Sequence, residues 1–123
     1  MADEIKLSVQ LTYAKGSAAA TFYPGSINIS QAAQGGHFPI ASVTTTASAI
    51  SFGSVGTPGI VVGRNLDTTN SLLVGPTTTS TGTYYPFLKV LAGEPFAFRL
   101  NGSLWKWKSS AGTVKVQLQI YEN

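Results

Sequence analysis

The stretch from Gly59 to Gly75, GIVVGRNLDTTNSLLVG, constrains the fold of this chain more than any other segment. Two short apolar runs, Ile60–Val62 and Leu72–Val74, flank the polar segment Arg64–Asn70, which is rich in residues that form turns. The runs are too short for capped helices, and consecutive apolar positions suit strands buried on both faces. We therefore predict a β-hairpin at the centre of the core. The residues to which we assign structural turn roles here are Gly59, Asn65, Asp67 and Asn70.

Period-2 alternation marks a segment near each end of the sequence. Apolar and polar residues alternate over Ile5–Tyr13 and again over Val114–Tyr121. This pattern is typical of a strand with one buried and one solvated face. We expect these two segments to be outer strands of two packed antiparallel sheets.

Glycine, proline and asparagine divide the rest of the chain into short segments. Pro24-Gly25 and Gly93 indicate turns, and Asn101-Gly102 predicts a two-residue hairpin turn. The segments that we expect to be extended between these turns are Ala18–Tyr23, Ile27–Ile29, Val43–Phe52, Tyr84–Leu91 and Phe96–Leu100. No segment combines helical periodicity with caps. The sequence predicts an all-β fold with almost no helix: one antiparallel β-sandwich domain over residues 1–123, jelly-roll-like, with about 8–10 strands.

The composition excludes several classes of function. The chain has no cysteine, which removes disulfides and thiolate chemistry. Charged residues make up 11% of the sequence, against roughly 25% in typical globular domains, and a surface this poor in charge suits packing between subunits. The net charge of +3 is scattered, so we expect no nucleic-acid partner. No apolar run approaches the roughly 20 residues of a membrane span and no leader precedes the first strand, so we expect a soluble protein without a membrane partner.

Catalytic chemistry finds little support in the sequence. His37 is the single histidine, so a cupin-like metal site with two or three histidine ligands is not expected. The carboxylates lie at the chain ends (Asp3, Glu4, Glu122) or in expected turns (Asp67, Glu94). Paired-carboxylate hydrolysis needs two acids held across one bond, and this placement does not provide them. We predict no enzyme activity, no metal and no cofactor.

The segment Trp105-Lys106-Trp107-Lys108 is the most suggestive local feature. Alternation places both indoles on one strand face and both ammonium groups on the other. An exposed indole face could stack on sugars or bases, whereas a buried one supplies core area, and we favour burial. Trp105 and Trp107 are nevertheless the candidate stacking residues.

Two segments are the candidate contact loops. Gln31–Pro39 contains two glycines, and the segment from Thr77 to Thr83 contains only threonine, serine and glycine. Exposed loops on a rigid sandwich are common binding sites. The candidate contact residues are His37, Phe38, Thr77, Thr78, Thr79 and Ser80.

Several short motifs occur together in the second half of the chain. They are Gly53–Gly59, Asn65–Asn70, Pro86–Leu88, Ala92–Glu94 and Phe98–Leu100. In order and spacing they resemble a family of small tailed-bacteriophage structural proteins, with an Asn-Leu-Asp-x-Thr-Asn tip followed by Pro-Phe-Leu and Ala-Gly-Glu. The resemblance covers about residues 50–123. The sequence departs from the family pattern at Ser71, at Pro95 and at the two tryptophans.

The resemblance implies a jelly-roll-like virion component made in the host cytoplasm. The first expectation is a capsid decoration or cement protein that stabilises the shell through multivalent non-covalent contacts. A tail or baseplate protein, or a glycan-binding module on the tail, are the alternatives. The implied partners are copies of the chain itself, with a trimer as the first expectation, and the major capsid protein or other virion proteins.

Overall fold

The computed structural model describes residues 4–79 and 82–123, and every regular element in this part of the chain is a β-strand. The predicted all-β class is therefore confirmed. The chain divides into two compact units, Met1–Ala32 and Ala33–Asn123. The sequence predicted one sandwich over residues 1–123 with about 8–10 strands. The described residues contain thirteen strands, because the first unit adds four to the nine that form the sandwich.

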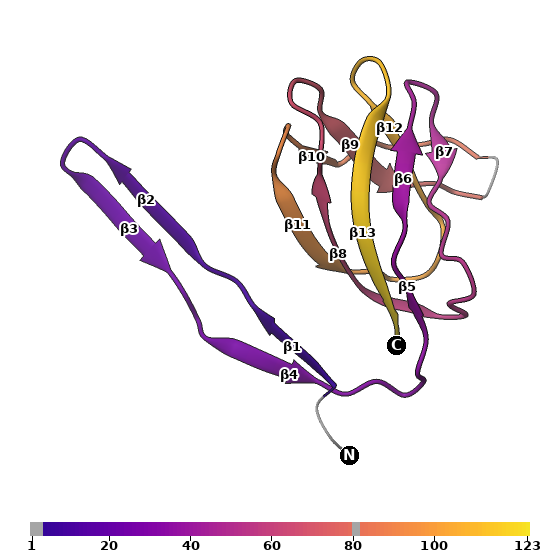
Figure 1. The fold of residues 1–123 in the computed structure, drawn as a ribbon, viewed down its shortest axis with the longest axis horizontal. Helices are drawn as coiled ribbons and strands as arrows, with labels where there is room; N and C mark the ends of the chain where they lie inside the picture. The colour runs from indigo at the N-terminus through magenta and orange to yellow at the C-terminus, as the bar shows by residue number, and fades with distance from the viewer. Residues whose placement is uncertain (1–3, 80–81) are drawn as a thin grey trace. The chain divides into compact units, whose positions relative to one another are not determined.

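The first unit is a two-stranded antiparallel ribbon, which we call the N-terminal ribbon (residues 5–29). Its strands are β1 (Ile5–Ser8), β2 (Leu11–Lys15), β3 (Ala18–Phe22) and β4 (Ser26–Ile29) (Figure 1). Strand β2 pairs with β3 around the turn at Gly16, and β1 pairs with β4. Gly16 has a φ of 60°, a conformation that glycine adopts at little cost. The three alanines of β3 are extended, as predicted.

The prediction for the first strand is wrong in its place and its continuity. Strands β1 and β2 are separated at Val9–Gln10, and both belong to the ribbon rather than to the sandwich. On the returning strand, Tyr23–Gly25 lies opposite this break with one residue more, as in a β-bulge. Pro24 has no N–H to donate to a ladder, and Gly25 has the expected positive φ of 93°. Pro24-Gly25 thus interrupts a strand and does not reverse the chain.

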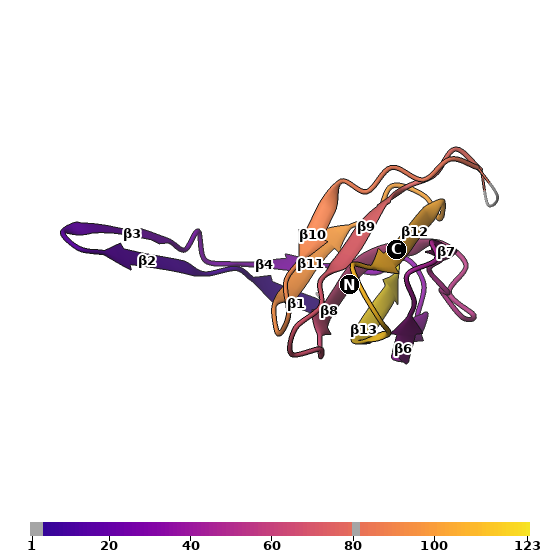
Figure 2. The same cartoon turned by 90° about the horizontal axis from the view of Figure 1, so that it is seen from above.

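The second unit is a sandwich of two antiparallel sheets (Figures 1 and 2). The five-stranded sheet has the order β11-β8-β13-β5, and β6 also pairs with β13. The four-stranded sheet has the order β10-β9-β12-β7. The strands are β5 (Gly36–His37), β6 (Ile40–Val43), β7 (Ser48–Ala49), β8 (Pro58–Asn65), β9 (Leu72–Pro76), β10 (Leu88–Val90), β11 (Pro95–Arg99), β12 (Trp105–Ser109) and β13 (Val114–Glu122).

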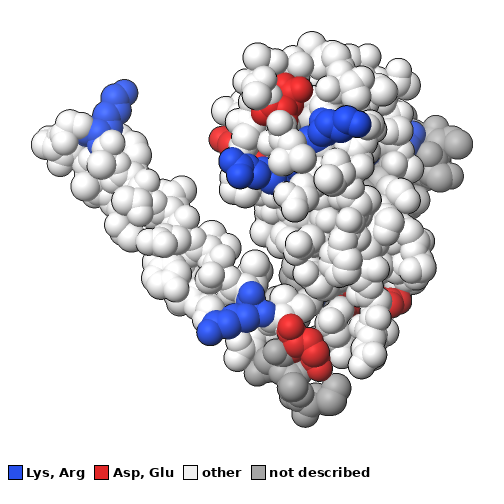
Figure 3. All heavy atoms as spheres, viewed as in Figure 1, with Lys and Arg blue, Asp and Glu red and all other residues white. Residues whose placement is uncertain are grey.

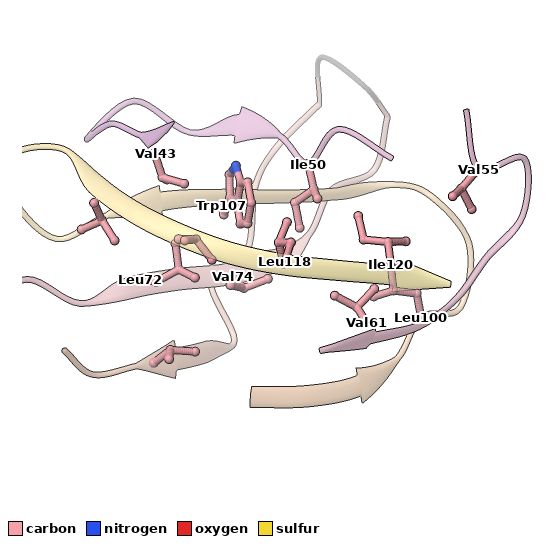
Figure 4. Close-up of a cluster of buried hydrophobic side chains, with 13 residues drawn as sticks. Val43, Ile50, Val55, Val61, Leu72, Val74, Leu100, Trp107, Leu118 and Ile120 are labelled. Atoms are coloured by element: carbon pink, nitrogen blue, oxygen red, sulfur yellow. The ribbon is translucent and has the colours of Figure 1, made fainter. Parts of the chain in front are cut away.

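The core lies between these two sheets and takes side chains from both of them (Figure 4). Strand β13 shows the expected alternation, because its apolar residues are buried and the residues between them are exposed. Its place is different from the prediction, since it pairs with neighbours on both sides and is an interior strand. The buried hydrophobic cluster consists of Val43, Ile50, Val55, Val61, Leu72, Val74, Val90, Leu100, Trp107, Val114, Val116, Leu118 and Ile120.

The two predicted hairpins are wrong, although their strands and turn residues exist. Strand β8 belongs to the five-stranded sheet and β9 to the four-stranded sheet, so these strands do not pair with each other. Strands β11 and β12, on either side of Asn101-Gly102, likewise belong to different sheets. The same turn residues can close a hairpin or carry the chain from one layer to the next. Only the strand pairing, which is a long-range property, distinguishes the two.

Three further expectations need correction. Gly59 is not a turn residue, because it lies inside β8, where its carbonyl accepts a hydrogen bond of 2.9 Å from the amide of Leu100. The expected strand Tyr84–Leu91 is reduced to β10, and the expected strand Val43–Phe52 contains only the end of β6 and the two-residue β7. Val43–Phe52 is rich in serine and threonine, Tyr84–Leu91 is interrupted by Pro86, and few residues of either segment have a partner in the ladders.

Candidate interaction surface

The segment that links β8 to β9 is held by the side chain of Asn65, which is fully buried. Its Nδ2 donates hydrogen bonds to the carbonyls of Asn70 and Val90, at 2.9 and 3.3 Å. Its Oδ1 accepts one from the amide of Asp67 at 2.9 Å. A buried amide with all its bonds made is a structural element. Asn65 is the last residue of β8, and its side chain reaches across the predicted turn segment to Asn70.

Asp67 forms the next turn in this segment. Its Oδ1 accepts hydrogen bonds from the amides of Asn70 and Thr69, at 2.6 and 2.8 Å, and from the hydroxyl of Thr69. These bonds, with the amide of Asn70 first, lower the pKa of the Asp67 carboxyl below its ordinary value. Asp67 lies in the segment for which we predicted a turn, and its carboxylate is engaged with backbone.

The Ala92-Gly93-Glu94 motif meets the Asn65 motif directly. The amide of Gly93 donates to the carbonyl of Asn65, and the amide of Asn65 donates to the carbonyl of Glu94, both at 3.0 Å. Glu94 Oε2 accepts the amide of Leu91 at 2.8 Å, and Gly93 has a φ of 78°. The Asn65–Asn70 and Ala92–Glu94 motifs, which both belong to the family pattern, are therefore joined by backbone hydrogen bonds. We call this joined pair of turns the node. The roles of both motifs are in turn formation, and both carboxylates are used there.

The tryptophan pair is mostly core. Trp107 is 4% exposed, as we expected, and cannot stack on a ligand. Trp105 is half-buried and stacks on Phe98 with 6.2 Å between ring centroids, and Phe98 stacks on Phe96 at 5.5 Å. All three partly buried rings pack against the core cluster. Only Trp105 retains a partly exposed indole, so the proposed pair does not form a two-ring platform.

The expected His/Phe loop is partly a strand. His37 belongs to β5 and pairs with Ile120 of β13, because Gly36 and His37 complete the end of the five-stranded sheet. The His37 side chain is half-buried and is not a free loop residue. Phe38 is 61% exposed and makes an edge contact of 5.6 Å with the ring of Tyr121. Of the two candidates, only Phe38 is largely exposed.

The threonine segment after β9 is also partly structural. Thr77 is buried, forms a β-bridge with Tyr84, and donates its hydroxyl to the carbonyl of Thr79 at 2.7 Å. Thr78 and Thr79 are exposed. Ser80 lies outside the described residues. The exposed part of this segment is small and polar.

The surface that sequence reasoning missed lies on the N-terminal ribbon. Residues directly opposite each other on paired strands share a face. One face of the β2–β3 half therefore carries the pairs Leu11–Phe22, Tyr13–Ala20 and Lys15–Ala18, and one face of the β1–β4 half carries Leu7–Ile27 and Ile5–Ile29. Leu11, Phe22 and Ile27 are 57%, 59% and 59% exposed. We call this set the apolar face of the ribbon.

The opposite face of the ribbon carries mostly small residues, with Lys6 and Asn28 as the exceptions. Its cross-strand pairs are Thr12–Thr21, Ala14–Ala19, Ser8–Ser26 and Lys6–Asn28. The sequence has no Asp, Glu, Lys or Arg between Lys15 and Arg64, so β3 and β4 carry no formal charge. Figure 3 shows uncharged atoms along most of the ribbon. The alternation that predicted a half-buried strand was correct as a pattern. It could not indicate that no other element of the first unit covers the apolar side.

No protein-family model matches this chain, and searches of curated proteins and of solved structures found no significant match. Residues 4–79 and 82–123 contain no helix that could cross a membrane. Within the same residues, no three His, Cys, Asp or Glu side chains gather in a way that could hold a metal ion. The strongest candidate for a functional surface in this part of the chain is the apolar face of the ribbon.

Proposed function

We propose that this chain is a structural protein of a tailed-phage virion, most simply a capsid decoration or cement protein. The observation that carries the proposal is the amphipathic ribbon with its exposed apolar face. Apolar surface of this kind marks a site of protein–protein contact. The motif resemblance supplies the virion class, and the low charge of the chain suits close packing among many subunits.

The occupied carboxylates support a non-catalytic role. Asp67 and Glu94 each accept backbone hydrogen bonds within their own turns, and Glu122 accepts the amide of Gly56 at 3.0 Å. A general acid or base needs to reach a substrate proton, and these three groups are directed to the backbone instead. This arrangement agrees with a role in binding neighbouring proteins.

We also propose that the sandwich is a jelly roll. The strand order supports this, because the successive strands β6, β7, β8 and β9 alternate between the two sheets, and β10 to β13 do so again. Jelly rolls have two such groups of four strands, each arranged as a Greek key. Jelly-roll domains occur in viral capsids, which agrees with the proposed class.

The test is reconstitution with virions that lack the protein. We expect the purified chain to bind purified capsids at a saturating, integral number of copies per capsid subunit, measured by co-sedimentation. Binding to isolated tails instead of capsids would move the assignment to the tail. Failure to bind either particle would reject the virion role.

A glycan-binding role on the tail is the second candidate, and it rests on the partly exposed indole of Trp105. Sugar rings stack on exposed indoles, so a glycan should change the emission of Trp105. The Trp105→Phe variant should lose that response, whereas the buried Trp107 contributes a constant background. An emission spectrum that no cell-surface glycan alters would remove this candidate.

A further inference from the structure

The N-terminal ribbon lacks the packing that a sheet of its kind needs. A two-stranded hairpin alone is marginally stable in water, and independent stability takes a third strand or a packed apolar face. In residues 4–32 the ribbon has two strands at every level, and no further element of this unit covers either face. An amphipathic antiparallel ribbon normally has its apolar side against protein. The apolar face of the ribbon therefore requires a surface to cover it.

The sheets of the sandwich in another copy are a less suitable surface, because cations lie among the apolar residues of their outer faces, of which Ile40 is 67% exposed. The outer face of the five-stranded sheet carries Arg64, Arg99 and Lys115, all exposed. The outer face of the four-stranded sheet carries three lysines. Lys89 of β10 and Lys108 of β12 lie on either side of Leu73, and Lys106 lies two residues before Lys108 on β12. Packing apolar side chains on these cations would remove charges from water without pairing them.

A second ribbon does offer a suitable surface. The apolar face has large side chains opposite each other in most of its cross-strand pairs, and it extends about 35 Å at roughly 3.4 Å per residue. A copy of this face has the same length and the same lack of charge along most of it. We propose that the apolar face of the ribbon packs against the apolar face of the ribbon in a second copy of this chain.

The expected strength of this contact follows from its size. Two strands about 4.8 Å apart, with their side chains, give a width of about 12 Å and a face of about 400 Å². A standard interface buries about 800 Å² on each partner, so ribbon contact alone gives a weak association. We therefore expect an oligomer whose population rises with protein concentration.

This inference refines the self-association that the proposed function includes, but its test contains no capsid. The two can therefore fail separately. A chain that forms oligomers through its ribbon and ignores virions would keep this inference and remove the virion role. A chain that binds capsids as a monomer would do the reverse.

The first experiment compares two neighbouring residues of β3 that lie on opposite faces. Phe22→Lys places a charge on the apolar face, and Thr21→Lys places the same charge on the polar face. Sedimentation velocity of the full chain over a range of concentrations measures the oligomer. We expect wild type and Thr21→Lys to associate alike, and Phe22→Lys to remain monomeric at concentrations at least tenfold higher. The emission of the buried Trp107 verifies that the sandwich of each variant is folded.

The second experiment locates the contact and does not depend on the stability of a charged variant. The chain has no cysteine, so a single introduced thiol is unique. Leu11→Cys lies on the apolar face near the middle of the ribbon, where it is close to its counterpart whichever way the two ribbons run. Thr12→Cys is the matched control on the other face. A short thiol-reactive cross-linker should join copies of Leu11→Cys and leave Thr12→Cys mostly uncoupled.

The possible outcomes separate clearly. Association that depends on Phe22, together with cross-linking at position 11 and not at position 12, supports the inference. A wild-type chain that is monomeric at every concentration overturns it. Association that survives Phe22→Lys, or equal cross-linking at the two positions, also overturns it, because copies would then meet through another surface such as the sandwich.

Discussion

The N-terminal ribbon and the last strand of the sandwich share one sequence pattern and have opposite surroundings. Ile5–Tyr13 and Val114–Tyr121 both alternate apolar and polar residues. In β13 the apolar residues Val114, Val116 and Ile120 are fully buried, whereas in β2 Leu11 and Tyr13 are 57% and 47% exposed. Alternation shows that a strand has a side to bury. It does not show whether the same chain provides the cover.

The largest difference between the two regions should appear in truncations of equal size. Leu118→Ala removes a side chain that is 2% exposed at the centre of the core, and we expect it to lower the free energy of unfolding by about 2–5 kcal/mol. Leu11→Ala removes the same atoms from the ribbon and should change sandwich stability by less than about 0.5 kcal/mol. Urea denaturation followed by tryptophan emission measures both. Equal losses would contradict the division into two units.

How far the sequence predicts the molecule depends on whether a feature is local or long-range. The short-range hydrogen bonds of Asn65 and Asp67 and the positive φ of Gly93 agree with the turn chemistry that the sequence indicated, because these features depend on backbone within a few residues. The partners of β8 and β9 were not, because pairing is decided by segments distant in sequence. The ribbon surface was missed for the same reason. We assumed that the apolar residues of the alternating segment Ile5–Tyr13 would pack into the core of the sandwich.

Asn65 tests the node that links the two motifs of the sandwich. Asn65→Ala removes a fully buried amide and leaves the carbonyls of Asn70 and Val90 and the amide of Asp67 without that partner. Unmet buried polar groups cost about 1–3 kcal/mol each, and partial relaxation should keep the total loss near 2–3 kcal/mol. The same denaturation measurement applies. Asn28→Ala on the ribbon is the comparison, and we expect it to leave sandwich stability unchanged. A loss at Asn65 no greater than that at Asn28 would show that the node is dispensable.

A smaller effect should come from two glycines with similar backbone conformations, one in each unit. Gly93 and Gly16 have φ values of 78° and 60°, and a Cβ built at either position meets no atom within 4 Å. Alanine at either site is therefore strained without a clash, at about 1–2 kcal/mol. Gly93→Ala should lower the unfolding free energy of the sandwich by this amount. Gly16→Ala should leave it unchanged and reduce the association of ribbons instead, which sedimentation detects. The reverse assignment of the two effects would remove the distinction between the units.

The smallest expected effect is the loss of sandwich stability at low pH, and we expect it in the sandwich and not in the ribbon. Backbone hydrogen bonds from Asn70 and Thr69 hold the pKa of Asp67 below its ordinary value of 3.8. A carboxyl whose pKa is lower in the folded chain adds stability above the unfolded pKa, and this stability disappears as the pH falls through the folded pKa. Wild type should therefore lose sandwich stability below about pH 4 more steeply than Asp67→Asn, whose amide does not titrate there. The cause is hydrogen bonding to backbone and not a neighbouring charge, so the difference between the two curves should persist in added salt. If the unfolding free energies of wild type and Asp67→Asn fall in parallel below about pH 4, the hydrogen bonds of Asp67 are equally formed in the unfolded chain.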